Sequence, residues 1–191
     1  MRRVALVHLS ELEPSRELLD FLSALAMHCF TNDYLYPERD DEAALVAELQ
    51  ETVCSPIDGS EAADLAALLC LATYRPIHQL LQASALTALD TVPELRQRIF
   101  AEPLIERALT TEIPSLGVIT DATSIKVRKQ YENNPYPRWV RACVRADPVA
   151  ADAVFKQSAL KFRSGCPLNL VNPEILIAGC GTGQHAIESA A

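Results

Sequence analysis

"ILIAGCGTGQHAI", residues 175–187, reads as a buried strand that runs into a glycine-rich turn and then into a helix. Ile175–Ala178 is continuously apolar, which is typical of a parallel strand covered on both faces. Glycines in such a turn let the backbone adopt conformations that a Cβ would resist, and they let a ligand approach the main chain closely. The turn is therefore predicted to be the floor of a ligand site, with these candidate contacts: Gly179, Cys180, Gly181, Thr182, Gly183 and Gln184.

The spacing of the glycines argues against two common nucleotide-binding turns. A dinucleotide fingerprint, G-x-G-x-x-G or G-x-G-x-x-A, would place its last small residue at Gln184, which is too large for close helix packing at that point. A P-loop requires a lysine followed by Ser or Thr, and this turn contains no lysine. The NAD interpretation is therefore weakened, and the ATP interpretation fails.

The pattern that remains, three glycines at alternate positions directly after an apolar strand, resembles motif I of the class I S-adenosylmethionine-dependent methyltransferases. In that family the turn passes beneath the methionine and ribose portions of the cofactor, and Gly179, Gly181 and Gly183 match its three glycine positions. The resemblance implies that a Rossmann-like α/β catalytic domain begins here and that the cofactor is S-adenosyl-L-methionine.

A second match lies upstream, at "QYENNPYPRW", Gln130–Trp139. It is similar to a tyrosine-glutamate-any-asparagine-proline-tyrosine-proline-arginine-tryptophan signature found shortly before motif I in a group of bacterial methyltransferases, which often carry tetratricopeptide repeats ahead of the catalytic domain. The variable position falls at Asn133. The helical front half also resembles the leader of that group, although no 34-residue period returns in this chain.

Four residues of the signature, Tyr131, Tyr136, Arg138 and Trp139, have two interpretations. They could line the cofactor site, because aromatic faces attract the sulfonium cation and an arginine can hold a carboxylate. They could instead clamp the helical leader onto the catalytic domain, because Trp and Tyr are common packing anchors with a polar handle. Both interpretations stay open, and no catalytic base can be assigned from the sequence.

A class I methyltransferase needs a sheet of about seven strands and an acidic residue about 20 positions beyond the turn, which binds the ribose hydroxyls as in dinucleotide sites. Neither follows the turn in this sequence. We therefore expect the chain to be the amino-terminal part of a longer methyltransferase. We expect residues 1–191 alone to bind the cofactor weakly or not at all.

Residues 1–120 are predicted to form an irregular helical bundle. Apolar residues recur at helical spacing from Pro14 to Phe30, and further helical patterns open at Asp40 and at Ser60. A later helix is predicted to begin at a cap near Asp121. The second pattern carries these apolar positions: Ala44, Leu45, Leu49 and Val53.

The formal net charge of −8 is unevenly distributed along the chain. Residues 1–120 hold 8 basic and 19 acidic side chains, whereas residues 121–165 hold 9 basic and 4 acidic ones. An acidic front half disfavours nonspecific nucleic-acid binding, and the basic middle contains no dense run of Lys or Arg. Docking of the basic segment on the acidic one is therefore favoured over a nucleic-acid partner.

The chain is predicted to be cytoplasmic and not inserted in a membrane. No apolar run approaches the roughly 20 residues that cross a bilayer, and the start of the chain lacks the long apolar core of a secretion signal. The 6 cysteines show no C-x-x-C spacing, so neither a zinc site nor a disulfide framework is expected. We predict no metal site.

Together these patterns predict a mainly α chain, in which an irregular helical bundle is followed by the first strand, turn and helix of a Rossmann-like domain. The predicted segments are a helical domain over 1–120, a connecting segment over 121–165 and the start of the cofactor-binding domain over 166–191. The predicted function is methyl transfer from S-adenosyl-L-methionine to an unidentified acceptor, with a possible site for a protein partner on the helical domain. The alternatives are a helical interaction module with a degenerate catalytic domain and an NAD-dependent oxidoreductase.

Overall fold

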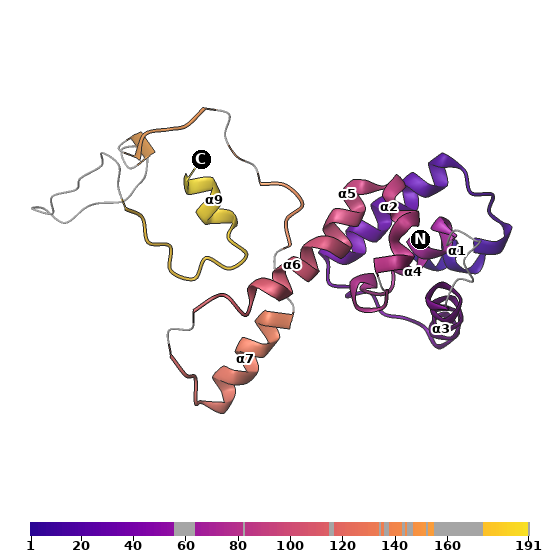
Figure 1. Cartoon of the computed structure of the whole chain (residues 1–191), viewed down its shortest axis with the longest axis horizontal. Helices are drawn as coiled ribbons and strands as arrows, with labels where there is room; N and C mark the ends of the chain where they lie inside the picture. The colour runs from indigo at the N-terminus through magenta and orange to yellow at the C-terminus, as the bar shows by residue number, and fades with distance from the viewer. Residues whose placement is uncertain are drawn as a thin grey trace, which may run out of the picture. The chain divides into compact units, whose positions relative to one another are not determined.

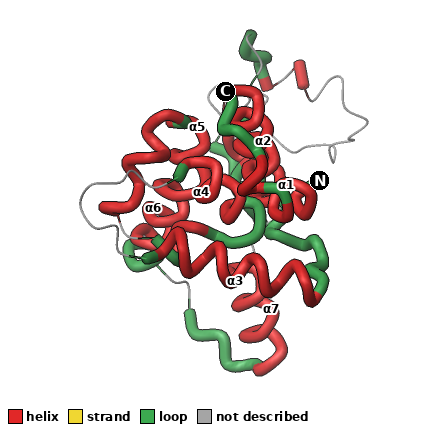
Figure 2. The backbone as a smooth tube through the Cα atoms, turned by 90° about the vertical axis from the view of Figure 1, so that its right-hand side faces the viewer, coloured by secondary structure: helices red, strands yellow, loops and turns green. Residues whose placement is uncertain are grey.

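The computed structural model describes residues 1–55, 64–81, 83–114, 117–133, 135, 138–142, 144, 147–151, 153–154 and 174–190. The chain divides into two compact units, Met1–Gln130 and Tyr131–Ala191. The described residues are mainly helical, as the sequence predicts, and Figure 2 draws them as helix and loop without a strand. The predicted division into segments 1–120, 121–165 and 166–191 remains a prediction.

The first unit is helical, and its colour in Figure 1 runs from indigo through magenta to orange; the helices from α1 to α6 form a bundle. It has short 3-10 segments between its longer helices. In chain order the elements that begin in this unit are α1 (Arg2–Val7), η1 (Leu9–Glu11), α2 (Arg16–Thr31), α3 (Asp40–Cys54), α4 (Leu65–Ala72), η2 (Ile77–Gln79), η3 (Ala83–Thr91), α5 (Pro93–Arg96), η4 (Gln97–Ala101), α6 (Glu102–Leu109) and α7 (Ala122–Asn133).

Helix α4 is the centre of this bundle. Its sequence, "LAALLCLA", is apolar all round, which is the composition of a helix with no solvent face. Residues 66–72 are all buried, and both α2 and α3 pack against the helix. Asp64 caps its start, because Oδ1 of that side chain accepts a hydrogen bond of 2.9 Å from the amide of Ala66. The predicted start at Ser60 lies outside the described residues.

Helices α2 and α3 confirm the two predicted helical patterns, with one difference in the buried face of α3. In α2 the buried side chains include Leu22 and Ala26, which lie within the apolar pattern predicted from Pro14 to Phe30. In α3, however, the predicted positions Ala44 and Leu45 are both exposed, Leu45 by 38%, and Val46 is fully buried instead. The buried stripe of α3 is Glu42, Val46, Leu49 and Val53. An acidic residue therefore opens the buried face, which the apolar pattern did not predict.

That acidic residue belongs to a buried polar network that fixes α1. Glu42 is 4% exposed and accepts a hydrogen bond of 2.6 Å from the hydroxyl of Tyr74. Arg2, which is 8% exposed, lies 3.7 Å from the same carboxylate and stacks over the ring of Tyr74, with its guanidinium carbon 4.4 Å from the ring centroid. Arg2 also donates to the carbonyls of Tyr36 and Pro37, at 2.8 and 3.0 Å. Both buried charges thus have an opposite charge and hydrogen bonds, as burial of charge requires, although Nη1 of Arg2 has no hydrogen-bond partner.

Elements α5, η4 and α6 follow one another without a break, from Pro93 to Leu109. The middle element, Gln97–Ala101, is a wider π-helical turn. Pro103 stands just after it and has no N–H to donate to the carbonyl four residues earlier, so a local departure from α geometry is expected at this point. In α6 no residue is buried. No helix in the described ranges is long and apolar enough to cross a membrane.

The second unit, Tyr131–Ala191, has little regular structure among its described residues. Helix α9 (Gln184–Ala190) confirms the helix predicted after the glycine turn. The predicted strand over Ile175–Ala178 is not observed, because residues 174–177 have no regular structure and Leu176 is 92% exposed. A strand is stabilised by pairing with a neighbour, and the described parts of the chain contain no strand with which these residues could pair.

Candidate functional site

The glycine-rich turn combines three residues whose backbone lies in the left-handed region. Gly179, Gly181 and Gly183 have φ values of +69°, +55° and +84°. L-residues with a side chain rarely adopt such values, because the Cβ approaches the following carbonyl. The choice of glycine at these three positions is thus explained by the conformation of the backbone itself.

The space beside the three glycines is open. A Cβ placed on any of them would meet no atom within 4 Å apart from its chain neighbours. Crowding within the chain therefore does not explain the absence of side chains here. An open face of this kind is what a ligand needs in order to approach the main chain closely.

Local hydrogen bonds shape the turn and lead into α9. The amide of Gly183 donates to the carbonyl of Cys180 at 3.0 Å, and the amide of Ile187 donates to the carbonyl of Gly183 at 3.0 Å. In the four-residue turn from Cys180 to Gly183, φ is positive at Gly181 and not at Thr182, which is the sign pattern of a type II′ turn.

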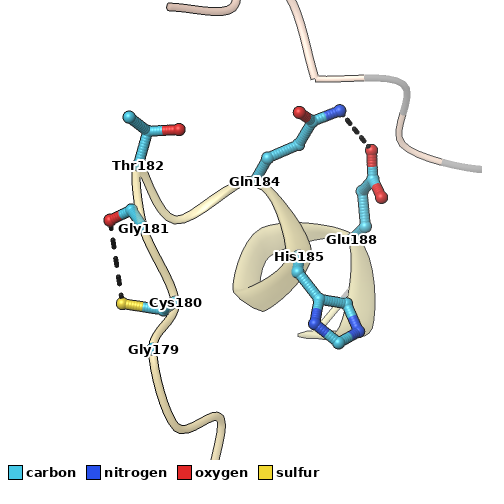
Figure 3. A pocket seen from close by; sticks show the side chains of 7 residues that line it. All are labelled: Gly179, Cys180, Gly181, Thr182, Gln184, His185 and Glu188. Carbon is cyan, nitrogen blue, oxygen red and sulfur yellow. Dashed lines mark hydrogen bonds between the residues drawn. The ribbon is translucent and has the colours of Figure 1, made fainter. Parts of the chain in front are cut away.

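The turn and the first helical residues line an open cavity of about 400 Å³. Figure 3 shows the turn on one side and the side chains of α9 on the other. Gln184 donates from Nε2 to Oε1 of Glu188 at 2.9 Å, so the two side chains form one edge of the cavity. The lining residues are Gly179, Cys180, Gly181, Thr182, Gln184, His185 and Glu188.

Five of the six candidate residues in the turn therefore line this cavity, and Gly183 supports it from within the turn. His185 and Glu188 also line the cavity, although the sequence favours a capping or solvent-facing role for His185 and assigns no role to Glu188. Glu188 stands four residues after Gln184, which is the spacing that places two side chains on one helix face. From this spacing the sequence could have indicated that Glu188 lies beside Gln184 at the site.

The structure also brings one residue of the upstream signature to the turn. Nε1 of Trp139 donates a hydrogen bond of 3.3 Å to the carbonyl of Thr182, and the indole is half-buried. Tyr131, near the end of α7, is 68% exposed and does not line the cavity. Arg138 is half-buried and does not line it either. Tyr136 lies outside the described residues.

Within the described residues, no three His, Cys, Asp or Glu side chains come together as a metal site. The cysteines described are free thiols: Cys29 and Cys70 are buried, and Cys54 and Cys180 are exposed. Cys180 borders the cavity, with Sγ 3.9 Å from the carbonyl oxygen of Gly181. The site can therefore offer backbone groups, the Thr182 hydroxyl, the Cys180 thiol and the longer polar side chains of α9 to a ligand.

Comparison of the chain with protein-family models, with curated proteins and with solved structures found no match to any of them.

Proposed function

We propose that the chain carries the cofactor-binding turn of an S-adenosyl-L-methionine-dependent methyltransferase, in which residues 166–191 begin a Rossmann-like domain. The supporting observation is the open turn with three glycines at positive φ, at the positions where the sequence resembles motif I. The proposed enzyme transfers a methyl group to an acceptor whose chemistry the described residues do not define. The cysteines that the structure describes are free thiols, which are typical of a reducing compartment and support a cytoplasmic enzyme.

Methyl transfer requires the acceptor to lie in line with the bond between the sulfonium sulfur and the methyl carbon. A lone pair of the acceptor forms the new bond to carbon, the pair of the carbon–sulfur bond stays on sulfur, and a proton leaves the acceptor. The residues of the turn would hold the cofactor in place, and much of the rate would come from proximity and orientation. No residue of the turn is assigned as a base.

The side chain of Gln184 argues against the alternative function of an NAD-dependent oxidoreductase. A dinucleotide turn requires a small residue there so that the helix can approach the strand. In this chain the position carries a long amide side chain that is hydrogen-bonded to Glu188.

The protein partner proposed for the helical domain, residues 1–120, remains a prediction.

The experiment that tests the proposal is a titration of the 191-residue chain with S-adenosylhomocysteine, followed by ¹⁵N–¹H correlation NMR. We expect chemical-shift changes concentrated at residues 179–184. We expect the binding to be weak, because an open cavity covers only one side of a ligand whereas tight sites enclose most of its surface. NADH and ATP serve as competing nucleotides in parallel titrations.

The decisive variant is Gly181→Val, because a branched side chain at φ +55° is strained and would fill the space of the ligand. Gly117→Val is the matched control: Gly117 also has positive φ and open space beside it, but it lies in the first unit. We expect the first change to abolish the shifts and the second to leave them intact. Shifts that survive Gly181→Val, or stronger binding of NADH, would remove the methyltransferase assignment.

A further inference from the structure

Trp139 is the single tryptophan of the chain, and it lies beside the glycine turn. Its indole N–H points to the carbonyl of Thr182 at 3.3 Å, across 43 residues of sequence. A tryptophan can only donate through Nε1, and a half-buried indole usually has a hydrogen-bond partner. The bond thus uses the one polar group of the side chain.

The position of that bond matters because of the residues on either side of it. Thr182 stands between Gly181 and Gly183, and both glycines have positive φ. Glycine loses more conformational freedom on ordering than any other residue, so a turn with alternating glycines is entropically costly to hold in one shape. The hydrogen bond from the Gly183 amide to the Cys180 carbonyl closes the turn only locally. Trp139 adds an anchor from a distant segment.

Thr182 itself belongs to the site, and its carbonyl group affects the shape of the turn. Thr182 lines the cavity, and it is half-buried, whereas Gly181 beside it is exposed. An anchor on the Thr182 carbonyl fixes the peptide between Thr182 and Gly183. The amide of Gly183 belongs to that peptide and donates to the carbonyl of Cys180, so its orientation sets the closure of the turn.

We infer that Trp139 is a positioning residue for the glycine turn, and that ligand binding in the turn is transmitted to its indole group. The second half of this inference rests on the proposed function, because it needs a ligand in the turn. The first half concerns the turn without ligand. Trp139 therefore acts through Thr182, and this residue of the upstream signature belongs with the glycine turn.

The ligand-free chain tests the first half. Trp139→Phe keeps an aromatic ring but removes the N–H donor together with part of the fused ring system, and Tyr131→Phe is the control within the same signature. In NMR spectra we expect the amides of Gly181, Thr182 and Gly183 to shift and exchange faster with solvent in Trp139→Phe, and to stay unchanged in Tyr131→Phe. Unchanged turn amides in Trp139→Phe would overturn the inference. Far-UV circular dichroism checks that the helical content is retained in both variants.

Titration with S-adenosylhomocysteine tests the second half. A single tryptophan gives a single indole N–H resonance, and we expect it to shift with the same Kd as the turn amides, a signature that a merely structural side chain would not give. A hydrogen bond of this type contributes about 0.5–1.5 kcal/mol, so Trp139→Phe should weaken binding about two- to tenfold.

The two proposals fail in different ways. If Trp139→Phe loosens the turn but the turn amides of the wild-type chain shift with NADH and not with S-adenosylhomocysteine, the proposed function is wrong and the positioning role stands. If ligand binds the wild-type chain and Trp139→Phe equally well, the positioning role is wrong and the proposed function stands. An indole resonance that stays still while the turn amides shift would also overturn the coupling of Trp139 to the ligand.

Discussion

Arg2→Met is the sharpest test of how the helical unit is held together. The guanidinium of Arg2 makes two hydrogen bonds to the backbone carbonyls of Tyr36 and Pro37, lies over the ring of Tyr74 and pairs with the carboxylate of Glu42. Methionine keeps an unbranched apolar stem and removes the charge and all the donors. The change therefore leaves a buried carboxylate without its cation.

The expected cost follows from what remains around Glu42. Removing one partner of a buried ion pair typically costs about 3–5 kcal/mol. Glu42 would still accept hydrogen bonds from the Tyr74 hydroxyl at 2.6 Å and from the Arg39 amide at 3.2 Å. These two donors stabilise the carboxylate, so we expect a loss at the lower end, about 3 kcal/mol. Against a total stability of about 5–15 kcal/mol, that loss is large.

Urea denaturation followed by far-UV circular dichroism measures this cost. With an m value of about 1–3 kcal/mol/M, a loss of about 3 kcal/mol lowers the midpoint by about 1–3 M. The same substitution in a Glu42→Gln background separates charge pairing from packing, because the amide keeps the shape of the side chain and an oxygen for Tyr74. We expect the cost of Arg2→Met to fall by about 1–2 kcal/mol in that background.

Two results would refute this reasoning. A cost of Arg2→Met below about 1 kcal/mol would mean that the buried pair carries little of the stability of the unit. An equal cost in the presence of Glu42 and of its glutamine variant would mean that the stacking of Arg2 on Tyr74, and not the charge pair, anchors α1.

Two further predictions concern the same unit. Arg75 donates to both carboxylate oxygens of Glu38, and this hydrogen bonding lowers the pKa of Glu38 below its usual 4.5. Glu38→Gln should therefore destabilise the chain by about 1 kcal/mol at pH 7, and the difference should vanish in urea titrations as pH falls through 4.5 and below, where the native carboxylate is protonated. Leu22→Ala should cost about 2–5 kcal/mol because Leu22 is fully buried, whereas Leu45→Ala, at a partly exposed position, should cost less than about 1 kcal/mol in the same assay.

The local features of the helical unit could be predicted from the sequence. The helix predicted near Asp121 begins at Ala122, and Oδ2 of Asp121 accepts a hydrogen bond of 2.7 Å from the amide of Ser124. Helix α3 begins at the predicted Asp40, with acidic residues throughout its first turn. These features depend on neighbours within one turn of helix, so a single segment contains the information that determines them.

The buried face of α3 could not be predicted in the same way. Glu42 is buried because Arg2 and Tyr74 satisfy its carboxylate, and those residues are 40 and 32 positions away. The apolar pattern assigned Leu45 to the core and passed over Val46, because it treated the acidic residue as a surface group. Long-range pairing of polar groups leaves no periodic trace in the sequence, so it can be recognised only once the helices have been placed.

The glycine turn has both a local feature that the sequence indicates and a long-range contact that it does not. The positive φ values at Gly179, Gly181 and Gly183 follow from residue type, and the sequence indicates them directly. The sequence left two roles open for the upstream signature, lining the site or clamping the helical leader. Trp139 does not itself line the cavity, but its hydrogen bond to Thr182 holds the indole beside the turn within the second unit. The exposed Tyr131 has no such bond to the turn among the described contacts, so the signature divides between residues that serve the turn and residues that do not.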